Sequence, residues 1–281
     1  MSKIISICNQ KGGVGKTTTA INLASYVALF GKKILLIDAD PQGNATSGIG
    51  IDKSKVTASL YQVLLEQKSA QEIIIPTQVE NLSIIPSNLD LTGAEVELVG
   101  AIGREFRLKK AIAEIRNSYD FVFIDCPPSL SLLTINALTA SDSALIPIQC
   151  EYYALEGLSQ LMKTINLVKG HLNNALVVEG ILLTMADYRT KLTQEVINEA
   201  RSYFKDKVYN TVIPRSIRLS ESPGFAKPIV FYDKASIGAV KYEELSREFL
   251  GEKISQHVEP KEVRENNADQ IPATNLDTDT P

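Results

Sequence analysis

The sequence NQKGGVGKTT, residues 9–18, lies between a short apolar run at 4–8 and a segment with helical spacing that begins at Ala20. Glycines in such a turn let the backbone approach a ligand closely, and the first turn of a helix presents free N–H groups at the positive end of its dipole. A polyphosphate needs such donors and positive charge. The stretch therefore predicts a strand, a phosphate-binding loop and a helix, the opening unit of a P-loop NTPase fold.

Each residue type in the loop has an expected role. Lys16 is expected to reach the β- and γ-phosphates of a nucleotide, and the Thr17 hydroxyl to hold Mg²⁺. The rest of the predicted ATP-binding loop consists of Gly12, Gly13, Val14, Gly15 and Thr18. The strict pattern G-x-x-x-x-G-K-[ST] is not met, because Gln10 stands where that pattern has glycine. A second lysine, Lys11, is also left without a role in a loop that needs only one.

Strand-like and helix-like segments alternate along the chain. Apolar runs too short for buried helices stand at 34–38, 82–86, 121–125, 144–148, 177–184 and 210–214. Apolar residues at i, i+3, i+4 and i+7 mark helical stretches at 20–27, 108–115 and 158–165. This alternation predicts an α/β fold with a mostly parallel, twisted sheet and helices on both of its faces, in one domain over residues 1–250.

Acidic residues stand where two of the predicted strands end, and ligands of such sheets bind beyond the carboxyl ends of the strands. Asp125 closes the run at 121–125 and precedes Pro127 and Pro128, which stop regular structure; it is expected to hold a Mg²⁺-bound water. Asp38 ends the run at 34–38 and Asp40 follows it, and one of them is expected to orient the attacking water. Capping of the following turn remains an alternative for both.

The net charge of −4 belongs to the end of the chain. Residues 251–281 carry seven acidic and three basic side chains, so residues 1–250 carry 26 of each sign. This polar stretch lacks hydrophobic periodicity, and it is expected to be an acidic, largely disordered tail. A neutral body can still carry a local basic face.

Composition argues against several other classes of protein. No apolar run reaches the length of a membrane span, so neither secretion nor membrane insertion is expected. Cys8, Cys126 and Cys150 are widely spaced and form no CxxC pair, which argues against a disulfide framework and a zinc site. A reducing cytoplasm fits these cysteines best. The two histidines lie in unremarkable settings.

The loop KGGVGKTT resembles the deviant phosphate loop of the ParA/MinD group of ATPases. The stretches LLIDADPQGNATS (35–47), FVFIDCPPSL (121–130), IPIQCEYYALEGL (146–158) and IPRSIRLSESPGFAKPIVFYD (213–233) resemble ParA, in particular its chromosomal Soj branch. The likeness covers nearly all of residues 1–250. It implies a DNA-partitioning ATPase that segregates chromosomes or plasmids and forms an ATP-bound sandwich dimer.

The resemblance also implies roles for single residues. Lys11 would cross the dimer interface to the partner's phosphates, which makes it both an ATP-binding and a catalytic residue. Asp40 matches the hydrolytic aspartate of the family, which leaves Asp38 to support the magnesium shell. The backbone near Met185 and Pro214 would contact adenine.

Double-stranded DNA is the second ligand that the resemblance implies. Arg189 and Arg218 match arginines that bind DNA in Soj-like proteins, and Lys191 and Arg215 could extend the patch. Since the first predicted strand begins by Ile4, no room is left for an operator-reading domain before it, and binding is expected to be independent of sequence. A ParB-type partner would stimulate slow hydrolysis and release the dimer from the nucleoid.

Two rival functions have sequence signatures that can be checked. MinD-like division-site regulators, the main alternative, end in a basic amphipathic helix that lies on the bilayer, whereas this tail is acidic and has no apolar stripe. Relatives of the nitrogenase iron protein need cluster cysteines, and Cys126 and Cys150 do not match that pattern. Burial as small hydrophobic residues is expected for these cysteines.

Overall fold

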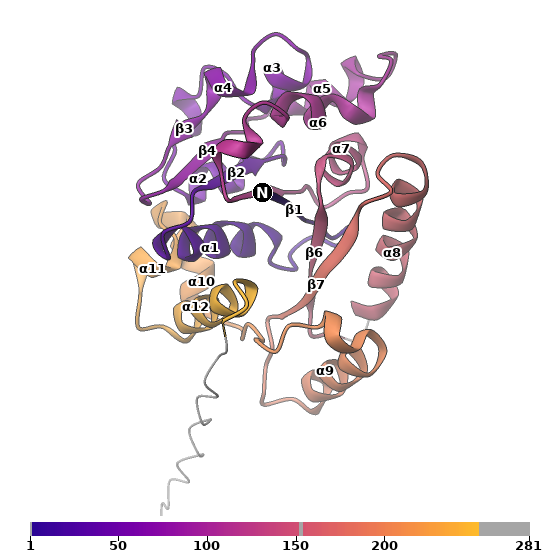
Figure 1. Cartoon of the computed structure of the whole chain (residues 1–281). Coiled ribbons are helices and arrows are strands. Elements are labelled where there is room, and N and C mark those ends of the chain that lie inside the picture. The colour runs from indigo at the N-terminus through magenta and orange to yellow at the C-terminus, as the bar shows by residue number, and fades with distance from the viewer. Residues whose placement is uncertain (1, 152–153, 253–281) are drawn as a thin grey trace, which may run out of the picture.

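Seven strands form one twisted sheet in the order β3-β4-β2-β5-β1-β6-β7 (Figure 1). This computed structural model describes residues 2–151 and 154–252, so the predicted tail lies outside the described residues apart from its first two. The strands are β1 (Lys3–Ile7), β2 (Ile34–Asp38), β3 (Ile75–Pro76), β4 (Leu82–Ile85), β5 (Phe121–Asp125), β6 (Ser143–Gln149) and β7 (Val177–Thr184). All neighbouring strands pair in parallel except β3 and β4. The predicted mostly parallel α/β sheet is confirmed.

Twelve helices connect the strands within the described part of the chain. They are α1 (Lys16–Leu29), α2 (Asn44–Gly48), α3 (Leu60–Leu64), α4 (Ala70–Ile73), α5 (Leu91–Glu97), α6 (Arg107–Ile112), α7 (Leu132–Ala140), α8 (Ala154–His171), α9 (Lys191–Phe204), α10 (Ile217–Glu221), α11 (Ile229–Tyr232) and α12 (Ile237–Phe249). None of these helices combines the length and the apolar character that a bilayer crossing requires.

Two hydrophobic clusters, one on each face of the sheet, form the core. Successive residues of a strand point to opposite faces, and accordingly Val122 packs in one cluster and Phe123 in the other. Helices α3 to α9 contribute to the first cluster, whereas α1, α2 and α10 to α12 contribute to the second. Figure 1 shows α1 and α12 together on one side of the sheet and α7 and α8 on the other. Helices therefore cover both faces, as predicted.

Parallel strands bring their carboxyl ends to one edge of the sheet. In the β2–β5 pairing, Asp38 lies opposite Asp125, and in the β1–β5 pairing Asp125 lies opposite Ile7, just before the glycine-rich loop. The same edge receives the end of β6 at Gln149 and the end of β7 at Thr184. Five strands thus deliver their last residues to one place.

The structure corrects three details of the sequence prediction. The apolar run at 210–214 forms no strand; it makes only an isolated bridge between Pro214 and Ala186. The short strand β3 was not predicted, since its two residues carry no periodicity. The helix expected over 108–115 ends at Ile112 and is followed by a 3-10 turn.

Candidate functional site

The loop between β1 and α1 has the conformation that a phosphate-binding loop needs. Gly13 and Gly15 adopt φ angles of 74° and 88°, in the left-handed region that favours glycine. Gly15 forms the N-cap of α1 without a side-chain cap, so N–H groups of the first helical turn remain available. The Thr184 hydroxyl, at the end of β7, donates to the carbonyl oxygen of Val14 at 2.9 Å and fixes the loop from behind.

Lys16 is buried in this loop, with 6% of its surface exposed. Its ammonium group donates to the carbonyl oxygen of Lys11 at 3.0 Å. Burial lowers the pKa of Lys16, and the nearby charges of Asp125 and Asp40 act in the opposite direction. A cation held in this way, with a single neutral acceptor, is suited to take up the charge of a phosphate group.

Lys11 lies on the outside of the loop. Its ammonium group donates to Glu151 at 2.9 Å, and both side chains are close to half exposed. The backbone N–H of Lys11 donates to Asn9, which in turn donates to the carbonyl oxygen of Pro147. Next to it Gly12 is exposed, and a Cβ there would meet no atom of the described part of the chain closer than 3.9 Å. Lys11 and Gly12 therefore face outward, where a second molecule can approach them.

Asp125 is a buried acid whose carboxylate is not satisfied by the described part of the chain. It is fully buried, and neither carboxylate oxygen has a hydrogen-bond partner among the described residues. Burial raises the pKa of Asp125 and the neighbouring Asp38 raises it further, while Thr17 and Lys16 act in the opposite direction. Two unpartnered oxygens beside a second acid and a threonine hydroxyl fit Mg²⁺, which takes oxygen ligands and retains several waters.

Asp38 is also buried, but its carboxylate is fully engaged. It accepts hydrogen bonds from the backbone N–H of Thr46 at 2.8 Å, from the Thr46 hydroxyl at 2.7 Å and from the N–H of Asp40 at 3.2 Å. Burial raises the pKa of Asp38, and the bonds from Thr46 act in the opposite direction. Asp38 thus fixes the turn that carries Asp40.

Asp40 stands at the edge of the site with 7% of its surface exposed. One carboxylate oxygen accepts the N–H of Gln42 at 2.9 Å, and the Ser87 hydroxyl donates to the carbonyl oxygen of Asp40 at 2.7 Å. Both its side chain and its backbone are therefore fixed by neighbouring residues. Its charge raises the pKa of both Lys16 and Asp125.

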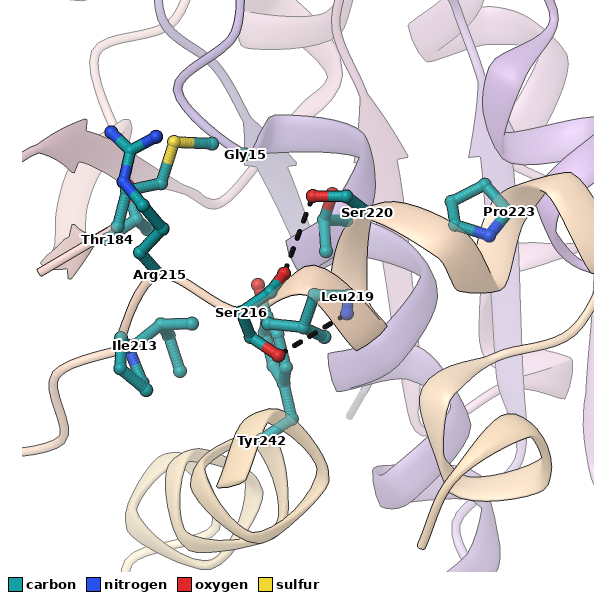
Figure 2. A pocket seen from close by; sticks show the side chains of 12 residues that line it. Gly15, Thr184, Ile213, Arg215, Ser216, Leu219, Ser220, Pro223 and Tyr242 are labelled. Carbon is teal, nitrogen blue, oxygen red and sulfur yellow. Dashed lines mark hydrogen bonds between the residues drawn. The ribbon is translucent and has the colours of Figure 1, made fainter. Parts of the chain in front are cut away.

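A pocket of about 310 Å³ adjoins the loop on the α1 side. Figure 2 shows Thr184, Ile213 and Arg215 along one side of it and Ser220 and Pro223 along the other. Gly15 and Thr18 connect the pocket to the phosphate loop, and Met185 and Pro214, the residues expected near adenine, also line it. The volume and the continuity with the loop fit the nucleoside half of a nucleotide.

The four predicted DNA contacts come from two parts of the chain: Arg189 and Lys191 follow β7, and Arg215 and Arg218 follow Pro214. Arg189 is exposed and donates to both oxygens of Asp187, and Arg215 lines the pocket and is exposed. Lys191 is exposed at the first position of α9. Arg218 was expected in a loop, but it lies in α10 and pairs with two acids, Glu221 at 3.0 Å and Asp233 at 3.3 Å.

Several residues of the site were not predicted. The segment after β6 supplies Glu151, α1 supplies Thr19, and α12 supplies Tyr242, whose hydroxyl lies 3.0 Å from that of Thr19. Glu151 lies within a stretch that resembles the family, but nothing local in the sequence marks Tyr242, which is 223 residues from Thr19. Cys126 and Cys150 are buried, as expected of small hydrophobic residues, and Cys8 is buried as well.

The fold and the loop at its carboxyl edge define a P-loop ATPase. A family model described as an AAA domain matches residues 2–178. The sporulation initiation inhibitor protein Soj of Bacillus subtilis is 58% identical over 248 residues, which cover 88% of this chain and 98% of that protein. The chromosome-partitioning ATPase Soj of Treponema pallidum is 50% identical over 250 residues, 89% of this chain and 98% of that protein. The chain belongs to the ParA/Soj family of chromosome-partitioning ATPases.

A solved structure supports the cofactors. The cobyrinic acid a,c-diamide synthase of Mycobacterium smegmatis, with a bound ATP analogue and magnesium, has a TM-score of 0.78 and 35% identity to this chain, and the match covers 89% of this chain and 95% of the other. The chain is an ATPase that uses ATP and Mg²⁺.

Proposed function

We propose that this protein is a DNA-partitioning ATPase whose ATP-bound sandwich dimer binds DNA without sequence preference. The two lysines of the loop carry this proposal. Lys16 is buried within its own loop, where it would bind phosphate in one subunit, whereas Lys11 is exposed beside the exposed Gly12. A charge developing on a transferred phosphoryl group is commonly met by a cation from outside the loop. Lys11 of one subunit would supply that cation to the nucleotide of the other.

Nucleotide binding is assigned to the loop and the adjoining pocket. Loop residues Gly12 to Thr18 surround the phosphates, and Met185 and Pro214 contact the base from the pocket wall. Thr17 and Asp125 hold Mg²⁺, which when bound offsets the phosphate charge, and Asp38 supports this shell by fixing the turn behind it. The unpartnered oxygens of Asp125 are the main support for this arrangement.

Hydrolysis is assigned to Asp40 together with Lys11. Gln42 and Ser87 position Asp40. Only one of its two carboxylate oxygens accepts the N–H of Gln42, so the other can accept a hydrogen bond from the attacking water. Lys11 is engaged by Glu151 within its own subunit. Turnover in the isolated chain is therefore expected to be slow, and a ParB-type partner would stimulate it.

DNA binding is assigned to Arg189, Lys191, Arg215 and Arg218. These residues would neutralise phosphates without reading bases, so affinity would be similar on any duplex and would fall steeply with salt. Two such patches on one dimer would bind one duplex through effective concentration, which makes DNA binding depend on ATP. The protein would then reside in the cytoplasm on the nucleoid.

A DNA-binding titration with ADP, ATP and a non-hydrolysable ATP analogue tests this function. Tight binding is expected with ATP and the analogue and weak binding with ADP, on two duplexes of unrelated sequence. Equal binding in all three nucleotide states would contradict the proposal. Sedimentation with anionic lipid vesicles tests the MinD-like alternative, which predicts ATP-dependent pelleting with the vesicles instead.

A further inference from the structure

Glu248, near the end of α12, accepts four hydrogen bonds from two consecutive residues. The backbone N–H of Asn210 donates at 2.6 Å and its side-chain amide at 3.0 Å. The backbone N–H of Thr211 donates at 2.9 Å and its hydroxyl at 2.7 Å. Hydrogen bonds to a carboxylate are stronger than those between neutral groups, so this is a firm attachment.

The attached segment leads directly into the pocket wall. The N–H of Ile213 donates to the carbonyl oxygen of Leu183, and Ala186 and Arg215 continue this ladder with bonds of 3.1 and 3.0 Å. Residues 213–215 are thus hydrogen-bonded to the end of β7 and the residues after it. The five residues before them, 208–212, belong to no strand or helix. Lacking a sheet ladder of their own, the N–H groups of Asn210 and Thr211 are satisfied by Glu248.

The same helix also reaches the pocket itself. Tyr242, about 1.7 turns before Glu248 in α12, lines the pocket, and its hydroxyl lies 3.0 Å from that of Thr19 in α1. Figure 2 shows Tyr242 extending from α12 toward the wall that carries Ile213 and Ser216. Helix α12 therefore meets the pocket in two ways: Tyr242 lines it, and Glu248 holds the segment that leads into its wall.

We propose that Glu248 is a positioning residue for the nucleoside half of the ATP site. Glu248 fixes the segment that precedes Ile213. Because this segment leads into the pocket wall at 213–215, Glu248 also sets the distance between that wall and the phosphate loop at Gly15. The inference rests on the proposed assignment of this pocket to the nucleoside. The phosphates are bound by the loop, to which Glu248 makes no hydrogen bond, so the effect is selective. Loss of Glu248 would weaken binding of the nucleoside and leave binding of the phosphates unchanged.

The test compares two ligands that differ by the nucleoside. Calorimetry would measure the affinity of the wild type and of Glu248→Gln for ATP and for inorganic tripolyphosphate, both with Mg²⁺. The glutamine amide keeps the size of the side chain, but its NH₂ group would face the donor groups of Asn210 or Thr211. Because these donors would lose an acceptor, about a tenfold loss of ATP affinity is expected. Tripolyphosphate affinity is expected to stay within about twofold of the wild type, a selectivity that general destabilisation would not produce.

Two further variants make the test independent of folding. Thr211→Val removes only the hydroxyl donor to Glu248, and it is expected to weaken ATP binding in the same selective way by a smaller factor. Glu244→Gln makes the same chemical change on α12 in an ion pair with Lys241, away from the wall, and is expected to match the wild type.

The outcomes separate this inference from the proposed site. Unchanged ATP affinity in Glu248→Gln, or an equal loss for both ligands, would overturn the positioning role. Ser220→Trp, which fills the pocket from an exposed position of its lining, should abolish ATP binding while tripolyphosphate still binds. If Ser220→Trp bound ATP like the wild type, the pocket would not be the nucleoside site, and the assignment itself would fail.

Discussion

Lys16 donates its hydrogen bond to the carbonyl oxygen of Lys11, at 3.0 Å, so the two lysines of the loop are in direct contact although their side chains serve different places. The side chain of Lys16 stays inside the loop, and that of Lys11 extends to Glu151 on its surface. Removal of one lysine should therefore affect a different step from removal of the other.

Lys16→Ala is expected to lower ATP affinity by about 100-fold or more, because the phosphates lose their main side-chain counterion. The fold should persist, since the side chain makes a single hydrogen bond, to a loop carbonyl. Isothermal calorimetry with Mg²⁺-ATP measures the loss. Lys32→Ala, at an exposed position after α1, is the matched control. Near-normal affinity of Lys16→Ala would sink the phosphate role.

Lys11→Ala is expected to bind ATP within about threefold of the wild type but to lose ATP-driven dimerisation, because its ammonium group serves the nucleotide of the other subunit. Light scattering with and without ATP gives the readout. Glu151→Gln is the control: it breaks the same ion pair, which is exposed and contributes only about 0.2–1 kcal/mol, yet it keeps the lysine. If Glu151→Gln also failed to dimerise, the ion pair itself would be what the dimer requires.

Most of the fold could be predicted from the sequence, for a physical reason. Strands buried on both faces read as unbroken apolar runs, and β2, β5 and β7 match the predicted boundaries residue for residue. The strand predicted at 210–214 is absent, because a buried segment outside the sheet gives the same unbroken apolar run as a buried strand. Val212 and Ile213 are buried, but the backbone N–H groups of the segment donate to the end of β7 and to Glu248, and the segment does not join the sheet.

The site was predictable only where its residues are adjacent in sequence. The loop at 11–18 and the acids at strand ends follow from local pattern. The difference between two similar acids does not: Asp38 accepts two hydrogen bonds from Thr46, eight residues on, whereas the oxygens of Asp125 accept none from the residues that the structure describes. Pro214 and Tyr242 line the pocket although they are far from the loop in sequence. The family resemblance predicted Pro214, and no sequence feature predicted Tyr242.

Gly12→Val is expected to fold and to bind ATP but not to dimerise. Among the described residues a Cβ at residue 12 meets only Pro128, at 3.9 Å, so the added side chain has room. It would project from the exposed face of the loop and obstruct a second subunit. Thermal melting should show a Tm close to that of the wild type, and light scattering should show monomers with ATP. Full dimerisation of this variant would place the interface elsewhere.

Asp40→Ala is expected to bind ATP and dimerise but to hydrolyse ATP about 100-fold more slowly, because the attacking water loses its acceptor. The turn should survive, since Ser87 bonds the backbone of Asp40 and Asp38 holds its N–H. A phosphate-release assay measures turnover, and retention on DNA in the presence of ATP is a second readout. Unchanged turnover would refute the role, while lost ATP binding would move Asp40 into the magnesium shell.

Arg189→Ala and Arg218→Ala are expected to keep ATP binding and dimerisation but to bind DNA more weakly, by a similar factor on any sequence. Each arginine is exposed and already paired with acids of its own chain, so a DNA phosphate must compete with Asp187 for Arg189 and with Glu221 for Arg218. Each substitution should therefore lower the slope of log affinity against log salt by at most about one.

A salt series with ATP present, on two unrelated duplexes, provides this measurement. Lys110→Ala, which removes an exposed cation from α6, a helix that carries none of the four predicted DNA contacts, should leave both affinity and slope unchanged. A loss confined to one duplex would indicate base readout, which contradicts the proposal. If both arginine variants bound like the wild type at every salt concentration, DNA would have to contact a different face, because these side chains would then contribute no phosphate contact.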